Sequence, residues 1–161
     1  MPAPVATVRG NPAGLKLRDG YQAFITFSLN PTIALWEKVV KPPGNDGGDP
    51  IDQTTMHNIL IRTKSPRYLS EITDTTSTVA YDPAAWDDIH SIINVPQTIT
   101  VTFSDGSTLA FFGYLKSFEP GDMSDGEQPE ATITIVATNI DPLSCEEYLP
   151  VMTPGAGSCV P

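Results

Sequence analysis

The chain has 161 residues and a mass of 17.3 kDa, which is the size of one domain, and its formal net charge is −10. Such an acidic charge argues against a protein that holds nucleic acid by neutralising its phosphates, so binding to DNA is disfavoured. Thr, Ile and Val make up about a quarter of the residues, and Pro and Gly are frequent, which favours short strands and turns over helices. We predict a single, mainly β domain over residues 1–161 that is soluble and does not enter a membrane.

The N-terminal quarter predicts an arm, two strands and a loop. Residues 1–20 hold several turn signals and no periodicity, which indicates an extended arm. Residues 22–29 and 32–40 are β-rich runs on either side of Asn30-Pro31, a pattern that predicts a hairpin. Residues 41–53 contain three Pro, three Gly and three Asp, and therefore predict a long loop that projects from the body.

The middle of the chain predicts two more strands and one helix. Two strands are expected within residues 54–81, and residues 58–63 give the clearest pattern. A helix is expected over residues 83–94, with Asp82 as its N-cap and Pro96 as its stop signal. Its apolar face is expected to contain Trp86, Ile89 and Ile93.

The strongest local signal lies in residues 99–120, where Asp105-Gly106 separates two β-rich runs and predicts a hairpin with a two-residue turn. A further strand is expected over residues 131–138, followed by a C-terminal arm over residues 141–161. The alternation places Ile99, Val101 and Phe103 in the core. It places Thr100, Thr102, Thr132 and Thr134 on polar sheet faces.

No set of residues predicts catalysis, a cofactor or a metal site. The two histidines, His57 and His90, lack further ligands at zinc spacing, and the Asp residues at 46, 49 and 52 do not have EF-hand spacing. No nucleophile motif or phosphate-binding glycine loop is present. Neighbouring acids such as Asp87 and Asp88, or Glu146 and Glu147, do not converge on one point. Cys145 and Cys159 are expected as free thiols, with a bridge to each other or to another copy as the alternative.

Three segments, residues 77–94, 99–118 and 127–142, occur in an order that resembles the tail tube protein (major tail protein) family of long-tailed siphovirus bacteriophages, which includes the tail tube protein of phage lambda. They cover about 40% of the chain; residues 1–76 resemble the family only in layout. The resemblance implies a β-sandwich or barrel flanked by one α-helix, with a long projecting loop and two arms. It also implies a structural virion protein without catalytic residues.

As a member of that family, the chain would form hexameric rings that stack into the hollow tail tube through which phage DNA is delivered to the host. It would be found in the virion, after assembly in the host bacterial cytoplasm. Its partners would be copies of itself and the tape-measure, tail terminator and distal tail proteins. DNA would pass through the lumen without specific binding, and an acidic wall with hydroxyl-rich faces suits this passage because it repels phosphate.

The charges predict how copies would contact each other. Residues 1–67 hold eight basic side chains and five acids, whereas residues 68–161 hold fourteen acids and one base, Lys116. Basic groups of one copy are therefore expected to face acids of the next. The candidate contact residues are Lys41, Asn45, Asp46, Asp49, Asp52, Arg9, Arg18, Arg62, Arg67, Glu119, Asp122, Asp125, Glu127 and Glu130, and the lumen candidates are Thr100, Thr102, Thr132 and Thr134.

Two alternatives remain from the sequence. The first is another ring protein of a phage tail or tail-like machine, such as a tail terminator or the tube of a contractile secretion device. The second is a carbohydrate-binding β-sandwich in which Trp36 and Tyr114 form stacking platforms. An aromatic residue inside a strand more often belongs to the core, which argues against the second.

Overall fold

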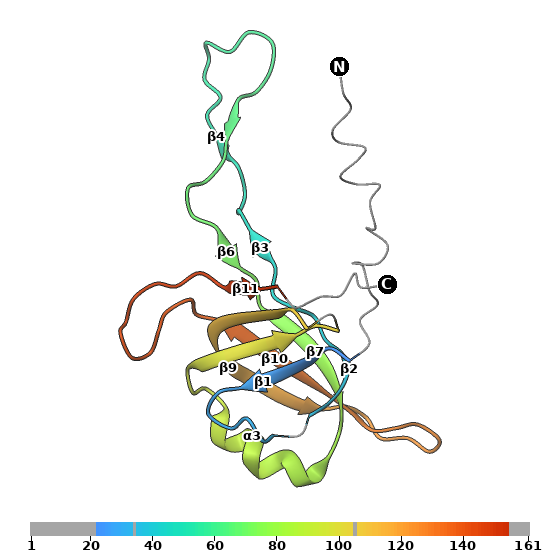
Figure 1. The fold of residues 1–161 in the computed structure, drawn as a ribbon. Helices are drawn as coiled ribbons and strands as arrows, with labels where there is room; N and C mark the ends of the chain where they lie inside the picture. The colour runs from blue at the N-terminus through green and yellow to red at the C-terminus, as the bar shows by residue number, and fades with distance from the viewer. Residues whose placement is uncertain (1–21, 34, 105, 155–161) are drawn as a thin grey trace, which may run out of the picture.

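The computed structural model describes residues 22–33, 35–104 and 106–154 (Figure 1). The body is one antiparallel sheet of seven strands, which confirms the mainly β prediction. The predicted arm over residues 1–20 lies outside the described residues. Six strands follow the order β1 (Phe24–Phe27), β8 (Gln97–Thr102), β9 (Thr108–Pro120), β10 (Glu130–Ala137), β7 (Thr75–Ala80) and β2 (Trp36–Val39), and β11 (Val151–Thr153) pairs with β9.

The sheet curls because β9 changes partners along its length. Its first half pairs with β8 and its second half with β10. Gly113 stands at the changeover, opposite Gln97 on one side and Ala137 on the other. The register between β9 and β10 also shifts at Thr134/Ile135, an irregularity of the kind that bends a strand and increases its twist. The curled sheet encloses the core.

Apolar side chains that alternate along the strands fill the inside of the curl. Ile99 and Val101 are 0% exposed, as predicted, and Phe103 packs against the same core while remaining partly exposed. Each fully buried side chain of this size contributes roughly 1.5–3 kcal/mol. The other buried apolar side chains are Ile25, Phe27, Val79, Ile89, Ile92, Leu109, Phe111, Leu115, Phe118, Ala131, Ile133 and Ile135.

The predicted helix is present at one end of the body. A 3-10 turn (Pro83–Ala85) leads into α3 (Trp86–Ile92). The Asp82 carboxylate accepts a hydrogen bond from the Ala84 N–H at 3.0 Å, which confirms Asp82 as the N-cap. The helix ends one turn before Pro96, as the proline signal indicates.

The buried face of α3 differs from the predicted one by one position. Ile89 and Ile92 are the buried side chains of the helix, whereas Ile93 is only partly buried. Ile93 already has an extended backbone and forms a bridge to Leu115 of β9. Trp86 is half exposed, and its ring lies edge-on to Phe118 with centroids 6.3 Å apart.

The predicted hairpin between residues 22–29 and 32–40 is wrong. β1 pairs with β8, which follows more than 70 residues later, and β2 pairs with β7. The two segments lie at opposite ends of the sheet order. Local composition identifies strands, but burial across the whole sheet selects their partners.

Residues 54–81 contain one strand of the main sheet, β7, but the strand predicted at residues 58–63 is wrong. Those residues form the turn of a long projecting hairpin. Its legs pair at β3 (Asn45–Asp46) with β6 (Glu71–Ile72), and at β4 (Ile51–Asp52) with β5 (Lys64–Ser65). The loop predicted at residues 41–53 is the first leg of this hairpin.

The hairpin of residues 99–120 is confirmed as β8 and β9, but its turn is longer than two residues. The Phe103 N–H donates to the Ser107 carbonyl at 2.9 Å, and Gly106 has a φ of 86°, which suits a three-residue connection. The strand predicted at residues 131–138 is also confirmed, as β10. The C-terminal segment contributes β11, a strand that sequence analysis did not predict.

Candidate interaction surfaces

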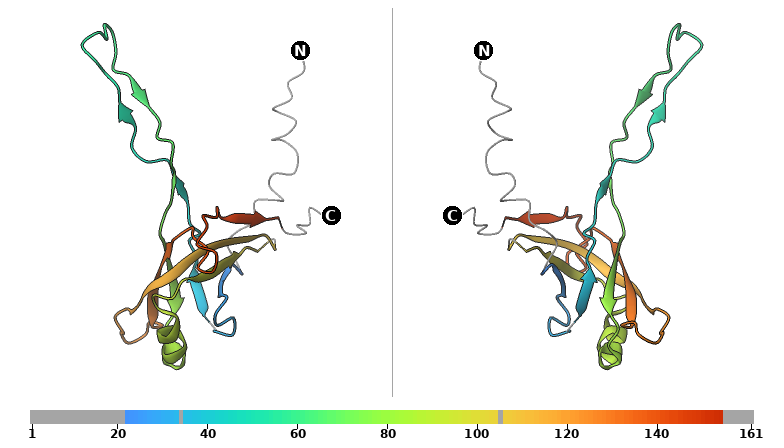
Figure 2. Two further views of the ribbon diagram at one scale, coloured as in Figure 1. Left: turned by 90° about the vertical axis from the view of Figure 1, so that its left-hand side faces the viewer. Right: turned by 90° about the vertical axis from the view of Figure 1, so that its right-hand side faces the viewer.

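The most prominent surface of the protein is the hairpin of residues 44–73, which projects from the end of the body opposite α3 (Figures 1 and 2). At its base the Thr73 N–H donates to the Gly44 carbonyl, and the Gly44 N–H donates to Oγ1 of Thr73, both at 2.9 Å. The side chains beyond this base are almost all exposed. The hairpin is therefore an appendage rather than part of the core.

The turn of this hairpin, residues 54–63, forms its tip. Asn58 organises it: its side chain donates to the Ile61 carbonyl and to Oγ1 of Thr63, at 3.1 and 2.7 Å, and accepts from the Thr55 N–H at 2.9 Å. Ile59, Leu60 and Ile61 are nevertheless 93%, 90% and 79% exposed. The tip thus holds large apolar side chains in water within a hydrogen-bonded frame, a feature that marks interaction sites.

The predicted contact acids of the first leg serve local roles. Oδ1 of Asp46 accepts from the Gly48 N–H, and Oδ1 of Asp52 accepts from the Thr54 N–H, both at 2.9 Å. Arg67 of the other leg donates to the Asp49 carbonyl at 2.8 Å. Within the described residues, no three acids, histidines or cysteines converge on a metal position. Lys41 and Asn45 lie at the base of the hairpin, and Arg62 lies on the tip.

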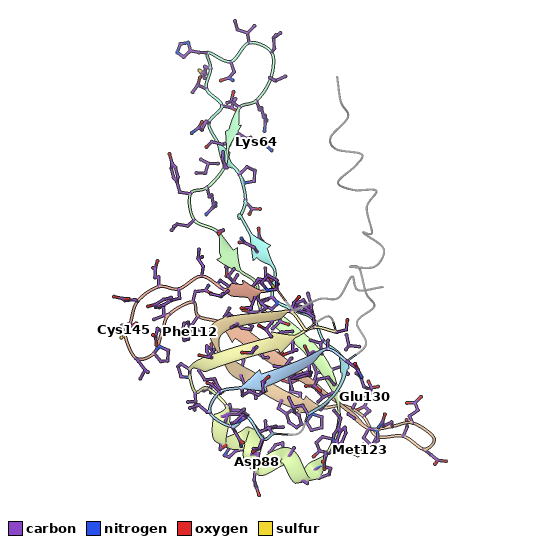
Figure 3. All side chains as sticks on the ribbon, in the orientation of Figure 1. Lys64, Asp88, Phe112, Met123, Glu130 and Cys145 are labelled. Carbon is purple, nitrogen blue, oxygen red and sulfur yellow. The ribbon has the colours of Figure 1, made fainter. Side chains whose placement is uncertain are left out.

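The acidic loop of residues 121–129 joins β9 to β10 and projects from the body (Figure 1). Asp122, Asp125 and Glu127 are exposed there, with Oε2 of Glu127 accepting from the Ser124 hydroxyl at 3.0 Å. Glu130, at the start of β10, already forms an ion pair with Lys38 at 2.6 Å. Glu119 is exposed near the end of β9. Figure 3 places Met123 and Glu130 on the side of the body away from Lys64, which lies far out on the hairpin.

The four threonines predicted for the lumen lie on two separate parts of the sheet. Thr100 and Thr102 of β8 stand opposite Ala110 and Thr108 of β9. Thr132 and Thr134 of β10 also stand opposite residues of β9, namely Glu119 and Ser117. The two rows are therefore at least seven residues apart along β9, or roughly 20 Å. The structure does not bring them together in one patch.

A cleft of about 900 Å³ separates the two edge strands, β1 and β2. Its walls include Phe24 of β1 and Trp36 of β2, together with Leu35, Val40 and Phe103. Trp36 is 63% exposed. Each edge strand has a strand partner on one side only, so this cleft combines apolar walls with backbone polar groups.

Glu37 is an ionisable group that lines this cleft. Its Oε1 accepts a hydrogen bond from the Ile25 N–H at 3.1 Å and so links the two edge strands. Burial raises the pKa of Glu37, and the hydrogen bond from Ile25 opposes that rise. Within the described residues Glu37 forms no ion pair. Glu37 was not among the predicted site residues, because one Glu in a β-rich run carries no signal of its own.

We expect Glu37→Gln to remove a pH dependence from the stability of the chain. Because the pKa of Glu37 is raised in the folded state, the folded state binds this proton more tightly, and the free energy of unfolding falls as pH rises from 4.5 through the folded pKa. The fall should stay below about 1 kcal/mol, since the carboxyl is half exposed to water. Denaturant unfolding at about pH 4 and about pH 7 measures it in both proteins; identical pH profiles would contradict the assignment.

The remaining candidate residues are dispersed. His57 lies on the tip, and His90, Asp87 and Asp88 are exposed on α3. Cys145 is an exposed free thiol, and Cys159 lies outside the described residues. Tyr114 is partly buried. Trp36 lines the cleft and is 63% exposed, so the expectation that this ring belongs to the core is wrong. Within the described residues, no helix has the length and apolar character needed to span a membrane.

Among the solved structures with a similar fold are chains of two particles. One is a chain of the virion of a native gene transfer agent particle, with a TM-score of 0.58 and 11% identity over 85% of this chain and 99% of that chain. Another belongs to the six-fold symmetrised baseplate of the anti-feeding prophage, with a TM-score of 0.54 and 9% identity over 82% and 91%. At such identities the likeness concerns the fold. No protein-family model matches the sequence, and no curated protein matches it significantly.

Proposed function

We propose that this chain is a structural subunit of a phage tail or tail-like particle, and that six copies form a ring and rings stack into a hollow tube that delivers DNA. The observation that carries the proposal is the projecting hairpin, whose fixed tip exposes Ile59, Leu60 and Ile61. It belongs to a body whose fold resembles chains of a virion and of a six-fold symmetrised baseplate. Exposed apolar groups on a rigid appendage suit assembly with other subunits.

The charge of the chain supports passage of DNA without binding. A net charge of −10 repels phosphate, and the sheet faces that carry the threonines offer hydroxyl groups rather than a basic cluster to hold it. In this proposal the chain is a non-enzymatic component of the virion, and its partners are its own copies with tape-measure, tail terminator and distal tail proteins. Because the two threonine rows lie on different parts of the sheet, only one of them would line the lumen.

Negative-stain electron microscopy of the concentrated protein tests the proposal. We expect six-fold rings or hollow tubes. A chain that remains monomeric at every concentration would contradict assembly by self-association. Rings that never stack would instead favour another ring protein of a tail-like machine, a second candidate supported by the fold likeness to a baseplate chain.

Assembly is expected to weaken as salt rises. If Arg62 and Arg67 of one copy face carboxylates of another, their attraction weakens when the ionic strength rises from 0.1 to 1 M, because the Debye length shortens from about 10 to about 3 Å. The concentration at which half the protein assembles should rise about fivefold or more. Sedimentation velocity measures this concentration. The paired variant Arg62→Gln, Arg67→Gln is the control, and it should lose the salt response.

A further inference from the structure

The tip of the hairpin has the properties of a preformed ligand for another protein surface. The Asn58 side chain accepts from the Thr55 N–H and donates to the Ile61 carbonyl, and these hydrogen bonds fix the backbone of the tip, so little conformational entropy is lost when it binds. Leu60 is 90% exposed and stands in the sequence between two exposed isoleucines. Residues 54–69 also contain three bases, Arg62, Lys64 and Arg67, and no acid. The tip is therefore both apolar and basic.

The cleft between β1 and β2 has the complementary properties. Phe24, Trp36 and Phe103 give it apolar walls, and Glu37 places a carboxylate in it without a cationic partner among the described residues. The cation that also lines it, Lys38, is neutralised by Glu130. A cleft of about 900 Å³ is at the upper end of the roughly 300–1,000 Å³ that encloses a compact ligand.

Acidic groups continue from the cleft along the neighbouring surface. Lys38 and Gln128 line the cleft and also a second pocket, which Asp122, Glu127 and Glu130 complete. A basic segment that entered the cleft would therefore meet Glu37 first and the acidic loop next. The hairpin of the same chain points away from its own body in every view, so the segment would have to come from another copy (Figures 1 and 2).

We propose that the hairpin tip of one copy docks in the β1–β2 cleft of a second copy, with Leu60 entering between Phe24 and Trp36 and Arg62 pairing with Glu37. This inference rests on the proposed function, in which copies assemble, and identifies the contact that joins them. Tip and cleft are different surfaces of one chain, so the contact is head-to-tail and leaves a free tip and a free cleft at the ends. It therefore propagates from copy to copy.

Reciprocal charge reversal tests the pairing. Arg62→Glu reverses the charge on the tip, and Glu37→Arg reverses the charge in the cleft. Each variant alone should need about tenfold more protein to assemble, as expected for a desolvated charge pair. In an equal mixture each reversed tip meets a reversed cleft, and each native tip meets a native cleft. The mixture should therefore assemble like the wild type. Lys116→Glu, the same charge change at an exposed position on β9, is the matched control and should have little effect.

Disulfide trapping provides a second readout that does not depend on Glu37→Arg folding. In a Cys145→Ser, Cys159→Ser background, a tagged Leu60→Cys chain is mixed with an untagged Trp36→Cys chain under mild oxidation. The expected product is a covalent heterodimer. Leu143→Cys, which is 93% exposed on the C-terminal loop, replaces Trp36→Cys in the control and should give none.

The outcomes separate the inference from the function on which it rests. If the wild type assembles but Arg62→Glu has no effect and no heterodimer forms, the tip–cleft contact is wrong and the assembly proposal stands. If the wild type never assembles, both are wrong. An apolar and basic tip is also the chemistry of a membrane-binding loop. Co-sedimentation of the wild type with anionic phospholipid vesicles, together with absence of the heterodimer, would overturn the docking proposal in favour of that reading.

Discussion

Gly113→Ala is expected to lower the free energy of unfolding by about 3 kcal/mol, the upper part of the range for an overpacked interior. A Cβ at this position would overlap the Val136 carbonyl oxygen and lie 3.3 Å from Cα of Ala137. These are backbone atoms of β10, so no side-chain rotation relieves the contact. Gly113 is also where β9 exchanges β8 for β10, and any displacement there disturbs both ladders.

Thermal or denaturant unfolding of the purified variant measures this loss. Gly47→Ala is the matched control, because a Cβ on Gly47 would have no atom within 4 Å. We expect the control to unfold within about 0.5 kcal/mol of the wild type, as is usual for surface positions. Equal stability of the two variants would contradict this prediction, because it would show that β9 and β10 can move apart enough to accommodate a Cβ at residue 113.

Removal of the hairpin is expected to abolish assembly while the body remains folded. Gly44 and Thr73 are hydrogen-bonded to each other, so residues 45–72 can be replaced by Asn-Gly, the preferred two-residue turn. The excised residues contribute no side chain to the buried core, since the core residues come from the main sheet and α3. The melting temperature should therefore change by no more than about 4 °C, the shift that corresponds to about 1 kcal/mol at this size.

Electron microscopy and sedimentation of the shortened chain give the result. Rings without tubes would assign the hairpin to stacking alone, whereas monomers would assign it to every contact between copies. Tubes of normal length from the shortened chain would contradict the role of the hairpin altogether. Asn58→Ala, which removes the frame of the tip but keeps its apolar side chains, should weaken assembly by a smaller factor.

The parts of the fold that the sequence predicted are those with local causes. The Asp82 cap and Pro83 define the start of the helical segment within a few residues. Alternation around Gly106 defines β8 and β9, because a turn residue and a two-residue period suffice to specify a hairpin. The same reasoning failed for β1 and β2, whose partners lie tens of residues away and are selected by burial across the sheet.

For the interaction surfaces too, the sequence predicted the features that depend on local composition and missed those that depend on residues far apart in the chain. Composition predicted that residues 41–53 project, and the charge distribution identified Arg62 and the acidic loop as candidates. It could not reveal that Glu130 is paired with Lys38, or that Glu37 stands between two strand edges, because both depend on strands brought together by folding. The run of Ile59, Leu60 and Ile61 looked like a strand. Apolar residues without polar alternation have the same sequence pattern whether they enter a core or are presented on a turn.

The order of the strands in the sheet has a consequence for synthesis. β1, which forms one wall of the cleft, is translated early, but its partner β8 follows more than 70 residues later. β2 forms the other wall, and its partner β7 follows β2 by more than 35 residues. At a ribosomal rate of about 5–20 residues per second, β1 waits for several seconds without a partner. The hairpin closes between residues only 12 to 14 apart at β4 and β5 and needs no such delay. A nascent chain therefore completes its tip before its cleft, so only a finished body can receive another copy.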